Sequence, residues 1–309
     1  MKSYPIKFLI FLILTFLYSY PLASFANITK TEALLINKKI EALENSLDGR
    51  IGIYALNTAN NQSIQYRALE RFPIQSTFKI MVVSAILKKN STDNQLLRKK
   101  ITYTNEDLVF WSPITEKNIN SGMTISELCA AAMMYSDNTA TNLIMKELGG
   151  PAAVTAFARS IGDTSFYVSN WEPELNSNPN NATDISTPKA MAKAVEKLAL
   201  EETLLVPQRE KLVAWMKGNT TGATRIRAGV PKGWVVADKT GSGDFGISND
   251  IAVIWPRDCA PIIVSIYSIQ NKKEAARHDE ILVSSTQLVI NEFSKNDSCL
   301  KLIKAYGFI

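Results

Sequence analysis

The order in which helical and β-type spacings of apolar residues alternate along the chain most constrains its fold. A helical spacing over residues 29–47 leads into a β-type run at 50–56, and the stretch from 76 to about 217 is then mostly helical. The later β-type runs lie at 233–239, 251–255 and 261–269, and a last helical stretch covers 274–293. A sheet built from both chain ends around a long helical insertion predicts a two-lobed α+β fold with a mainly antiparallel sheet and a cleft between the lobes.

The helical insertion contains several separate periodic segments. They lie at 76–89, 124–135, 139–148, 151–161 and 188–200. Thr124 and Glu127 have the spacing of a capping box, which predicts that a helix starts there. We therefore expect an α/β lobe formed by 27–75 and 219–295, a helical lobe formed by 76–218, and a C-terminal tail, 296–309, of unassigned role.

The first 26 residues have the pattern of a secretory signal peptide. Lys2 and Lys7 precede an apolar run at 8–17, and small residues stand at Ser24 and Ala26. The alternative is an uncleaved membrane anchor, but the run is short for a bilayer span. We expect cleavage after Ala26, secretion to the periplasm if the host is Gram-negative, and no stable membrane association afterwards.

Charge and histidine content exclude several functions. The chain has 34 Lys and Arg against 29 Asp and Glu, a formal net charge of +5, and no long basic run of the kind that follows a phosphate backbone. Nucleic acid is therefore not expected as a partner. His278 is the only histidine, which excludes zinc or iron sites built from several histidines unless carboxylates and thiols supply nearly all the ligands.

Three cysteines are an odd number for an exported chain, so at least one thiol is unpaired within the molecule or pairs between molecules. Cys129 lies in an apolar helical run and is interpreted as a small buried hydrophobe. Whether Cys259 and Cys299 form a bridge is left open by the sequence.

Ser76-Thr-Phe-Lys79 places a hydroxyl and an amine one helical turn apart on the same face, so the lysine can accept the serine proton. The apolar run 80–87 that follows predicts a buried helix with Ser76 at its N-terminal end, where a developing oxyanion is stabilised. Alone, the tetrapeptide is equally compatible with an N-capping serine and a lysine whose amine reaches solvent.

Two further tripeptides make the pattern specific: Ser136-Asp-Asn138 after a helical run, and Lys239-Thr-Gly241 at the end of a β-type run. In this order and at these intervals, the three motifs resemble class A β-lactamases and penicillin-binding proteins. The resemblance extends over about residues 30–295 and is strongest to the cefotaxime-hydrolysing branch of class A. It implies the two-lobed fold of these enzymes, with helices from both chain ends flanking the sheet and an all-helical lobe, a monomer, and no metal or organic cofactor.

The stretch Trp171-Glu172-Pro-Glu-Leu-Asn176 is similar to the omega-loop motif of class A enzymes, in a loop expected at about 169–187. There, a glutamate and an asparagine hold the water that hydrolyses the acyl-enzyme. Penicillin-binding proteins lack this glutamate. The motif therefore favours a secreted β-lactamase over a transpeptidase or carboxypeptidase acting on D-alanyl peptides, and over a non-catalytic sensor that stays acylated at Ser76.

The resemblance implies a role for each matched residue in the reaction steps. Ser76 attacks the β-lactam carbonyl, with the backbone N–H groups of Ser76 and Ser242 as the oxyanion hole. Lys79 and Glu172 share the activation of Ser76, and which of them is the acylation base is left open. Ser136 passes a proton to the lactam nitrogen. Glu172 deacylates, with Asn176 holding the water.

The resemblance also implies which residues bind the substrate, a small-molecule β-lactam. The set is Asn138 for the side-chain amide, Lys239, Thr240, Ser242 and Arg225 for the carboxylate, and Trp111 at the cleft mouth. For Trp111, an ordinary half-buried tryptophan is the alternative. Ser242 and Asp244 resemble cefotaximases, which predicts turnover of oxyimino-cephalosporins.

Several positions depart from the family pattern. Asn170 stands where most members have an arginine paired with an aspartate that matches Asp184, so that ion pair is absent here and the anchoring of the omega loop is left open. Val83 replaces the usual disulfide partner of Cys129. Gln75 and Gly243 occupy the positions of the carbapenemase cysteine pair, so carbapenem hydrolysis gains no support there. His278 lies near a cefotaximase arginine but is interpreted as a surface helix residue.

Overall fold

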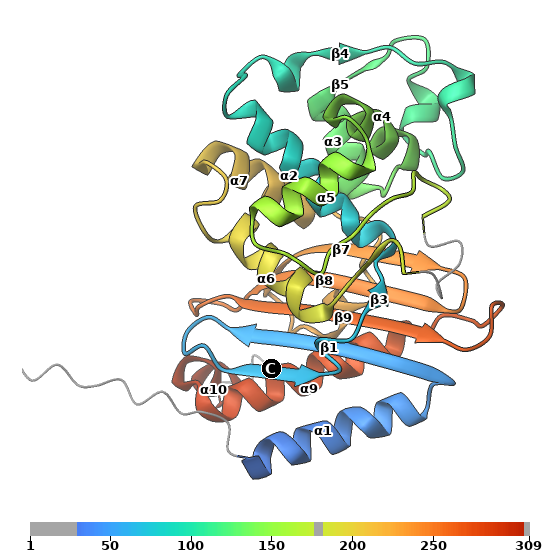
Figure 1. Ribbon diagram of the computed structural model, residues 1–309. Helices are drawn as coiled ribbons and strands as arrows, with labels where there is room; N and C mark the ends of the chain where they lie inside the picture. The colour runs from blue at the N-terminus through green and yellow to red at the C-terminus, as the bar shows by residue number, and fades with distance from the viewer. Residues whose placement is uncertain (1–29, 176–181, 306–309) are drawn as a thin grey trace, which may run out of the picture.

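The computed structural model describes residues 30–175 and 182–305, which fold around a five-stranded antiparallel sheet (Figure 1). The strand order is β2-β1-β9-β8-β7. The strands are β1 (Gly49–Asn57), β2 (Ser63–Tyr66), β7 (Val235–Gly243), β8 (Ile247–Trp255) and β9 (Ile262–Gln270). The full nine-residue pairing of β1 with β9 joins the N-terminal and C-terminal parts of the chain, which confirms the expected α+β sheet built from both ends.

The central strands are buried on both faces because helices cover the sheet on each side (Figure 1). Helices α1 (Lys30–Asn45), α9 (Asp279–Asn296) and α10 (Ser298–Ala305) lie on one side. Their apolar residues, such as Ile40 and Phe293, share a core with Ile266 of β9. This burial on both faces agrees with the apolar runs at 251–255 in β8 and 262–264 in β9.

The helical lobe lies on the other side of the sheet and shares one continuous core with it. Helix α2 (Lys79–Asn90) is buried along most of its length at the centre of this lobe, as its apolar sequence predicts. Helix α6 (Pro188–Ala199) packs directly on β1, β8 and β9, so the lobes are not separated by a solvent layer there. The lobe's other helices are α3 (Ile125–Met134), α4 (Asn138–Leu148), α5 (Pro151–Ser160) and α7 (Val206–Lys217).

Short elements connect these helices and strands. They are β3 (Phe72–Pro73) paired with β6 (Ile185–Ser186), β4 (Lys100–Ile101) paired with β5 (Met123–Thr124), the four-residue α8 (Ile226–Gly229), and the 3-10 turns η1 (Gln75–Phe78), η2 (Leu96–Arg98), η3 (Asn105–Asp107) and η4 (Thr115–Lys117). The capping box at Thr124 and Glu127 is confirmed, with both of its reciprocal hydrogen bonds present at the start of α3.

Two helix boundaries differ from the sequence expectation. The helix expected from Ser76 begins as the 3-10 turn η1 and becomes α-helical only at Lys79. The last periodic helix begins at Asp279 instead of residue 274, because a turn at 273–274 and an irregular segment at 275–278 precede it. No helix within 30–175 and 182–305 combines the length and apolar character needed to cross a bilayer.

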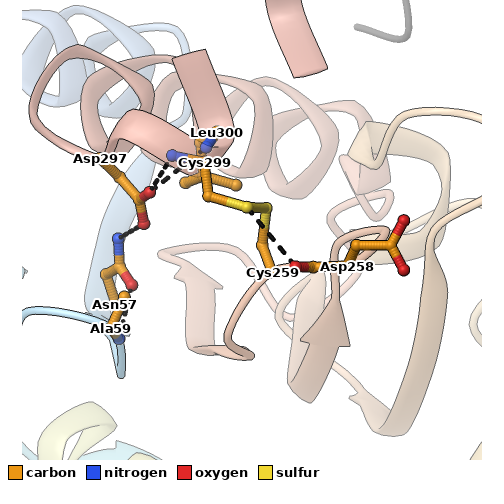
Figure 2. Close-up of a disulfide and its surroundings, with 7 residues drawn as sticks. All are labelled: Asn57, Ala59, Asp258, Cys259, Asp297, Cys299 and Leu300. Atoms are coloured by element: carbon orange, nitrogen blue, oxygen red, sulfur yellow. Dashed lines mark hydrogen bonds between the residues drawn. A yellow bond between two sulfur atoms is a disulfide. The ribbon is translucent and has the colours of Figure 1, made fainter. Parts of the chain in front are cut away.

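A disulfide joins Cys259, in the turn between β8 and β9, to Cys299 on α10 (Figure 2). Next to it, the Asp297 carboxylate accepts hydrogen bonds from the Cys299 and Leu300 backbone N–H groups and from Asn57 Nδ2 at the end of β1. The described part of the tail is therefore a helix attached to the sheet. Cys129 is a free, fully buried thiol, as expected.

Candidate active site

Four segments meet beside the sheet edge formed by β7: the turn η1, the loop between α3 and α4, the loop that contains Glu172, and β7 itself. Gly241 of β7 faces η1 so closely that a Cβ on it would lie 3.0 Å from the Ile74 carbonyl oxygen and 3.3 Å from the Ser76 nitrogen. A residue without a side chain is therefore needed for the strand and the turn to approach each other.

Buried hydrogen bonds to the sheet strands β8 and β9 hold the turn that carries Ser76. Thr77 Oγ1 donates to the Ile74 carbonyl oxygen at 2.5 Å and lies 2.8 Å from the Tyr267 hydroxyl of β9. Asn249 Nδ2 of β8 donates to the Pro73 carbonyl oxygen at 2.8 Å. Both sheet residues are buried, so the backbone around Ser76 is held rigidly against the sheet.

Lys79 is fully buried, and its ammonium group has several acceptors around it. Its Nζ donates to Asn138 Oδ1 at 2.5 Å and to the Ser136 carbonyl oxygen at 2.8 Å, and lies 3.1 Å from Glu172 Oε1. Burial lowers the pKa of Lys79, while the Glu172 carboxylate opposes that shift. A lowered pKa makes a lysine lose its proton more readily than an exposed one, so more of it is in the neutral form that can act as a base.

The Ser136 hydroxyl lies between two lysines. Its Oγ is 3.3 Å from Lys79 Nζ and 3.1 Å from Lys239 Nζ. Lys239 is fully buried, and burial together with the nearby charge of Lys79 lowers its pKa to about 7. A hydroxyl in contact with two amines of lowered pKa is suited to pass protons.

Asp137 fixes the loop that carries Ser136 and Asn138, a role that the sequence analysis did not assign. Its buried carboxylate accepts hydrogen bonds from the backbone N–H groups of Ala140, Ile114 and Thr115. Asp137 is thus the N-cap of α4, and it also ties that helix to the loop 110–115. The sequence feature that could have indicated this capping role is an aspartate immediately before a helical run.

The Glu172 carboxylate contacts both the Ser76 hydroxyl and the Lys79 ammonium group. Its Oε1 lies 3.4 Å from Ser76 Oγ and 3.1 Å from Lys79 Nζ, and the residue is only 7% exposed. Asn142 of α4 holds the Glu172 backbone at both ends, because its Oδ1 accepts from the Glu172 N–H and its Nδ2 donates to the Glu172 carbonyl oxygen. No pattern along the chain indicates this role for Asn142.

The family's ion pair is absent at Asn170, as expected, but hydrogen bonds to Asp184 anchor the loop in its place. Asn170 Nδ2 donates to Asp184 Oδ2 at 2.6 Å, and the backbone N–H groups of Ser169 and Asn170 donate to Asp184 Oδ1 at 2.9 and 3.2 Å. A neutral amide therefore binds the same aspartate that the family arginine would reach. Asn176 lies outside the described residues.

The remaining predicted residues border the same region. Arg225 is 3% exposed; its Nη1 donates to the carbonyl oxygens of Gly241 and Asn249, and its Nη2 donates to Ser242 Oγ. Thr240 is buried, with its hydroxyl in contact with that of Thr221. Lys239, Thr240 and Ser242 of β7 and Arg225, which precedes α8, thus form one cationic and hydroxyl-bearing group of side chains.

Trp111 is 52% exposed and stands next to the loop of Ser136, a position compatible with both the cleft-mouth role and an ordinary half-buried tryptophan. Its carbonyl oxygen accepts from the Asn138 N–H, and its ring nitrogen donates to the Tyr135 carbonyl oxygen. His278 is a partly exposed residue before α9, with Nδ1 2.7 Å from Glu280 Oε1, which agrees with its interpretation as a surface residue.

The arrangement supports nucleophilic acyl transfer. A serine hydroxyl is in contact with a carboxylate, that carboxylate is paired with a buried lysine, and a second hydroxyl connects two lysines. In the part of the chain that the structure describes, no three His, Cys, Asp or Glu side chains are grouped so that they could hold a metal ion.

Comparison with known proteins gives one consistent result. Residues 35–293 match the model of the β-lactamase enzyme family. Beta-lactamase OXY-2 of Klebsiella oxytoca is 49% identical over 269 residues, covering 87% of this chain and 92% of its own. Beta-lactamase Toho-1 of Escherichia coli is 46% identical over 281 residues, covering 91% and 97%. The crystal structure of a β-lactamase from Desulfarculus baarsii superimposes with a TM-score of 0.82 at 46% identity, covering 83% of this chain and 96% of that one.

Proposed function

The chain belongs to the β-lactamase enzyme family as a class A serine β-lactamase, and we propose that Ser76, Lys79, Ser136, Glu172 and Asn176 carry out its reaction. The enzyme hydrolyses the β-lactam ring of penicillins and cephalosporins through a serine acyl-enzyme and confers resistance to these antibiotics.

In acylation, Ser76 Oγ attacks the lactam carbonyl carbon and the C–N bond of the ring breaks. The contacts of Ser76 with Glu172, and of Glu172 with Lys79, support proton removal by this pair. The backbone N–H groups of Ser76 and Ser242 stabilise the oxyanion. The position of Ser136 Oγ between two lysine amines supports its delivery of a proton to the departing nitrogen.

In deacylation, Glu172 removes a proton from a water molecule, which attacks the acyl carbonyl carbon and releases Ser76. The burial of Glu172 and its contact with Ser76 Oγ place this base next to the ester bond that must be broken. Asn176 holds the water together with Glu172.

The substrate carboxylate binds at Lys239, Thr240, Ser242 and Arg225. The hydrogen bond of Arg225 to Ser242 Oγ supports a common binding surface, because it joins the guanidinium to the strand that carries the other three groups. Asn138 binds the side-chain amide of the substrate, and Trp111 covers the cleft mouth.

The contact between Ser76 Oγ and Glu172 Oε1 carries the proposal, because hydrolysis needs a base beside the acyl-enzyme. Intact-protein mass spectrometry during benzylpenicillin turnover tests it. We expect the lactam to disappear catalytically while the protein returns to its unmodified mass. A persistent adduct on Ser76, with lactam remaining, would instead identify a penicillin-binding or sensor protein.

We also propose that the substrate range includes oxyimino-cephalosporins such as cefotaxime. The support is Ser242 and Asp244 in the sequence, and the half-buried Ser242 hydroxyl held by Arg225. A relative 45% identical over 280 residues is named a carbapenem-hydrolyzing β-lactamase, but Gln75 and Gly243 stand at the carbapenemase cysteine positions here. An enzyme that hydrolyses benzylpenicillin and leaves cefotaxime intact would refute the proposal.

We propose that the protein is exported to the periplasm and that its signal peptide is cleaved after Ala26. We also propose that the mature protein is a monomer. The support is the pattern of the first 26 residues, which lie outside the described part of the chain. The mass and sedimentation of the protein recovered from a periplasmic extract test both points. A chain that starts at Met1, or a dimer, would contradict them.

A further inference from the structure

We propose that Asp279, at the start of α9, is a positioning residue that holds Arg225 in the orientation needed to bind the substrate carboxylate. This inference depends on the carboxylate-binding role of Arg225 proposed above. The sequence analysis gave Asp279 no role, and it lies 54 residues from Arg225 along the chain.

The Asp279 carboxylate connects three separate segments. Its Oδ1 accepts from Arg225 Nε at 3.1 Å and from Ser248 Oγ of β8 at 2.6 Å. Its Oδ2 accepts from Thr224 Oγ1 at 2.6 Å. Asp279 is also in the first turn of the 18-residue α9, where the helix dipole favours a negative charge. The carboxylate is therefore fixed from several sides.

The charge environment of Asp279 supports an ion pair with Arg225. Burial alone raises the pKa of Asp279, but hydrogen bonds from Ser248 and Thr224 and the charge of Arg225 outweigh that effect and lower the pKa. The Asp279 side chain is 23% exposed and that of Arg225 is 4% exposed, so solvent screens the pair only partly. The lowered pKa favours the carboxylate form of Asp279 beside Arg225.

Four of the five N–H donors of the Arg225 guanidinium have a hydrogen-bond partner among the described residues. A guanidinium has five N–H donors. The Nε–H binds Asp279, the two Nη1 donors bind the carbonyl oxygens of Gly241 and Asn249, and one Nη2 donor binds Ser242 Oγ. Among the described residues, the second Nη2 donor has no partner. It lies beside the Ser242 hydroxyl, where a substrate carboxylate can accept from both groups.

The planarity of the Arg225 guanidinium explains how Asp279, in contact with Nε, can orient Nη1 and Nη2. Fixing Nε on one side fixes the direction of Nη1 and Nη2 on the other, because all three nitrogens lie in one plane. Without Asp279, the guanidinium keeps its buried charge but loses the only carboxylate among its hydrogen-bond partners in the described chain. The expected consequence is weaker ground-state binding of the substrate, with the groups at Ser76 unaffected.

A double-mutant cycle tests the inference through KM and kcat for benzylpenicillin. We expect Asp279→Ala to raise KM about tenfold while kcat changes less than about twofold, since the lost interaction serves binding. In an Arg225→Ala background, Asp279→Ala is expected to add no further increase, because the residue it orients is already gone. Glu280→Ala, the next residue of α9 and exposed, is the matched control and is expected to leave both constants unchanged.

Asp279→Asn keeps an acceptor of the same size and serves as the test if the alanine variant fails to fold; we expect a smaller rise in KM with the same dependence on Arg225. Loss of kcat at constant KM, or effects that multiply in the double variant, would overturn the inference. If Arg225→Ala raises KM and Asp279→Ala does not, the inference alone is wrong. If Arg225→Ala leaves KM unchanged, the proposed role of Arg225 is wrong and the inference fails with it.

Discussion

Oε1 of Glu172 lies 3.4 Å from Oγ of Ser76, although 96 residues separate the two along the chain. The same oxygen is 3.1 Å from the buried ammonium group of Lys79. One carboxylate is thus in contact with both the proposed nucleophile and the lysine that shares its activation. This arrangement makes the two half-reactions separable by mutation.

Glu172→Ala is expected to trap the acyl-enzyme. Lys79 remains next to Ser76 in this variant, so acylation by benzylpenicillin continues, but the water loses its base. We expect deacylation to slow by about 10²-fold or more, seen by mass spectrometry as an adduct that persists after the lactam is consumed. Glu174→Ala, exposed in the same loop, is the matched control and should turn over normally. Unchanged turnover of Glu172→Ala would remove this residue from the mechanism.

The pH dependence of substrate binding is expected to reflect Lys239. Its pKa is lowered to about 7 by burial and by the charge of Lys79, so its ammonium form is present below that pH and is lost above it. KM for benzylpenicillin should therefore rise, and kcat/KM fall, as the pH increases through about 7.

Lys239→Arg provides the control for this pH dependence. An arginine keeps its charge over the whole range because its pKa exceeds about 12. The fall in kcat/KM near neutral pH should therefore disappear in this variant, whatever its absolute activity. A wild-type profile that is flat between about pH 6 and 9 would contradict the assignment.

Asn170→Ala is expected to weaken the loop that carries Glu172. The change removes the side-chain donor to Asp184, which is fully buried, while the two backbone donors stay in place. Losing a hydrogen bond to a buried charge costs about 1–3 kcal/mol, so the free energy of unfolding should fall by that amount. Denaturant unfolding measures it, and a rapid-quench measurement should show slower deacylation with unchanged acylation. A variant as stable as the wild type would show that this bond does not anchor the loop.

The disulfide between Cys259 and Cys299 is expected to stabilise the fold without affecting catalysis. It closes a loop with a sequence separation of 40 residues, and α10, which carries Cys299, lies on the side of the sheet opposite the helical lobe (Figure 1). Chain-entropy arguments give a stabilisation of about 3–4 kcal/mol for a loop of this length.

Cys299→Ser should therefore lower the melting temperature and leave kcat and KM for benzylpenicillin unchanged at ambient temperature. Dithiothreitol should lower the melting temperature of the wild type and not that of the variant, which separates loss of the bridge from other effects of the substitution. A loss of activity at a temperature where Cys299→Ser is folded would show that the tail influences the site.

The sequence was most informative where the determinants are local. Apolar spacing predicted the central strands and the buried helix α2, and the capping box predicted the start of α3. The motifs at Ser76, Ser136 and Lys239 identified the chemistry because their residue types are specific in combination. Asn170 shows the limit of such reasoning. The sequence shows that the family's arginine is absent there, but not that the Asn170 amide donates a hydrogen bond to Asp184 instead.

Periodicity and motif order can be read along the chain, so the α+β class and the family could be predicted from the sequence and site residues could be proposed from it. Four relationships became visible only in the folded molecule: the Cys259–Cys299 pairing, the place of Ser136 between two lysines, the hold of Asn142 on the Glu172 backbone, and the contact of Asp279 with Arg225. Each of these contacts joins residues tens of positions apart. Their distances depend on how the helical lobe and α9 pack against the sheet, and packing of that kind leaves no regular spacing in the sequence.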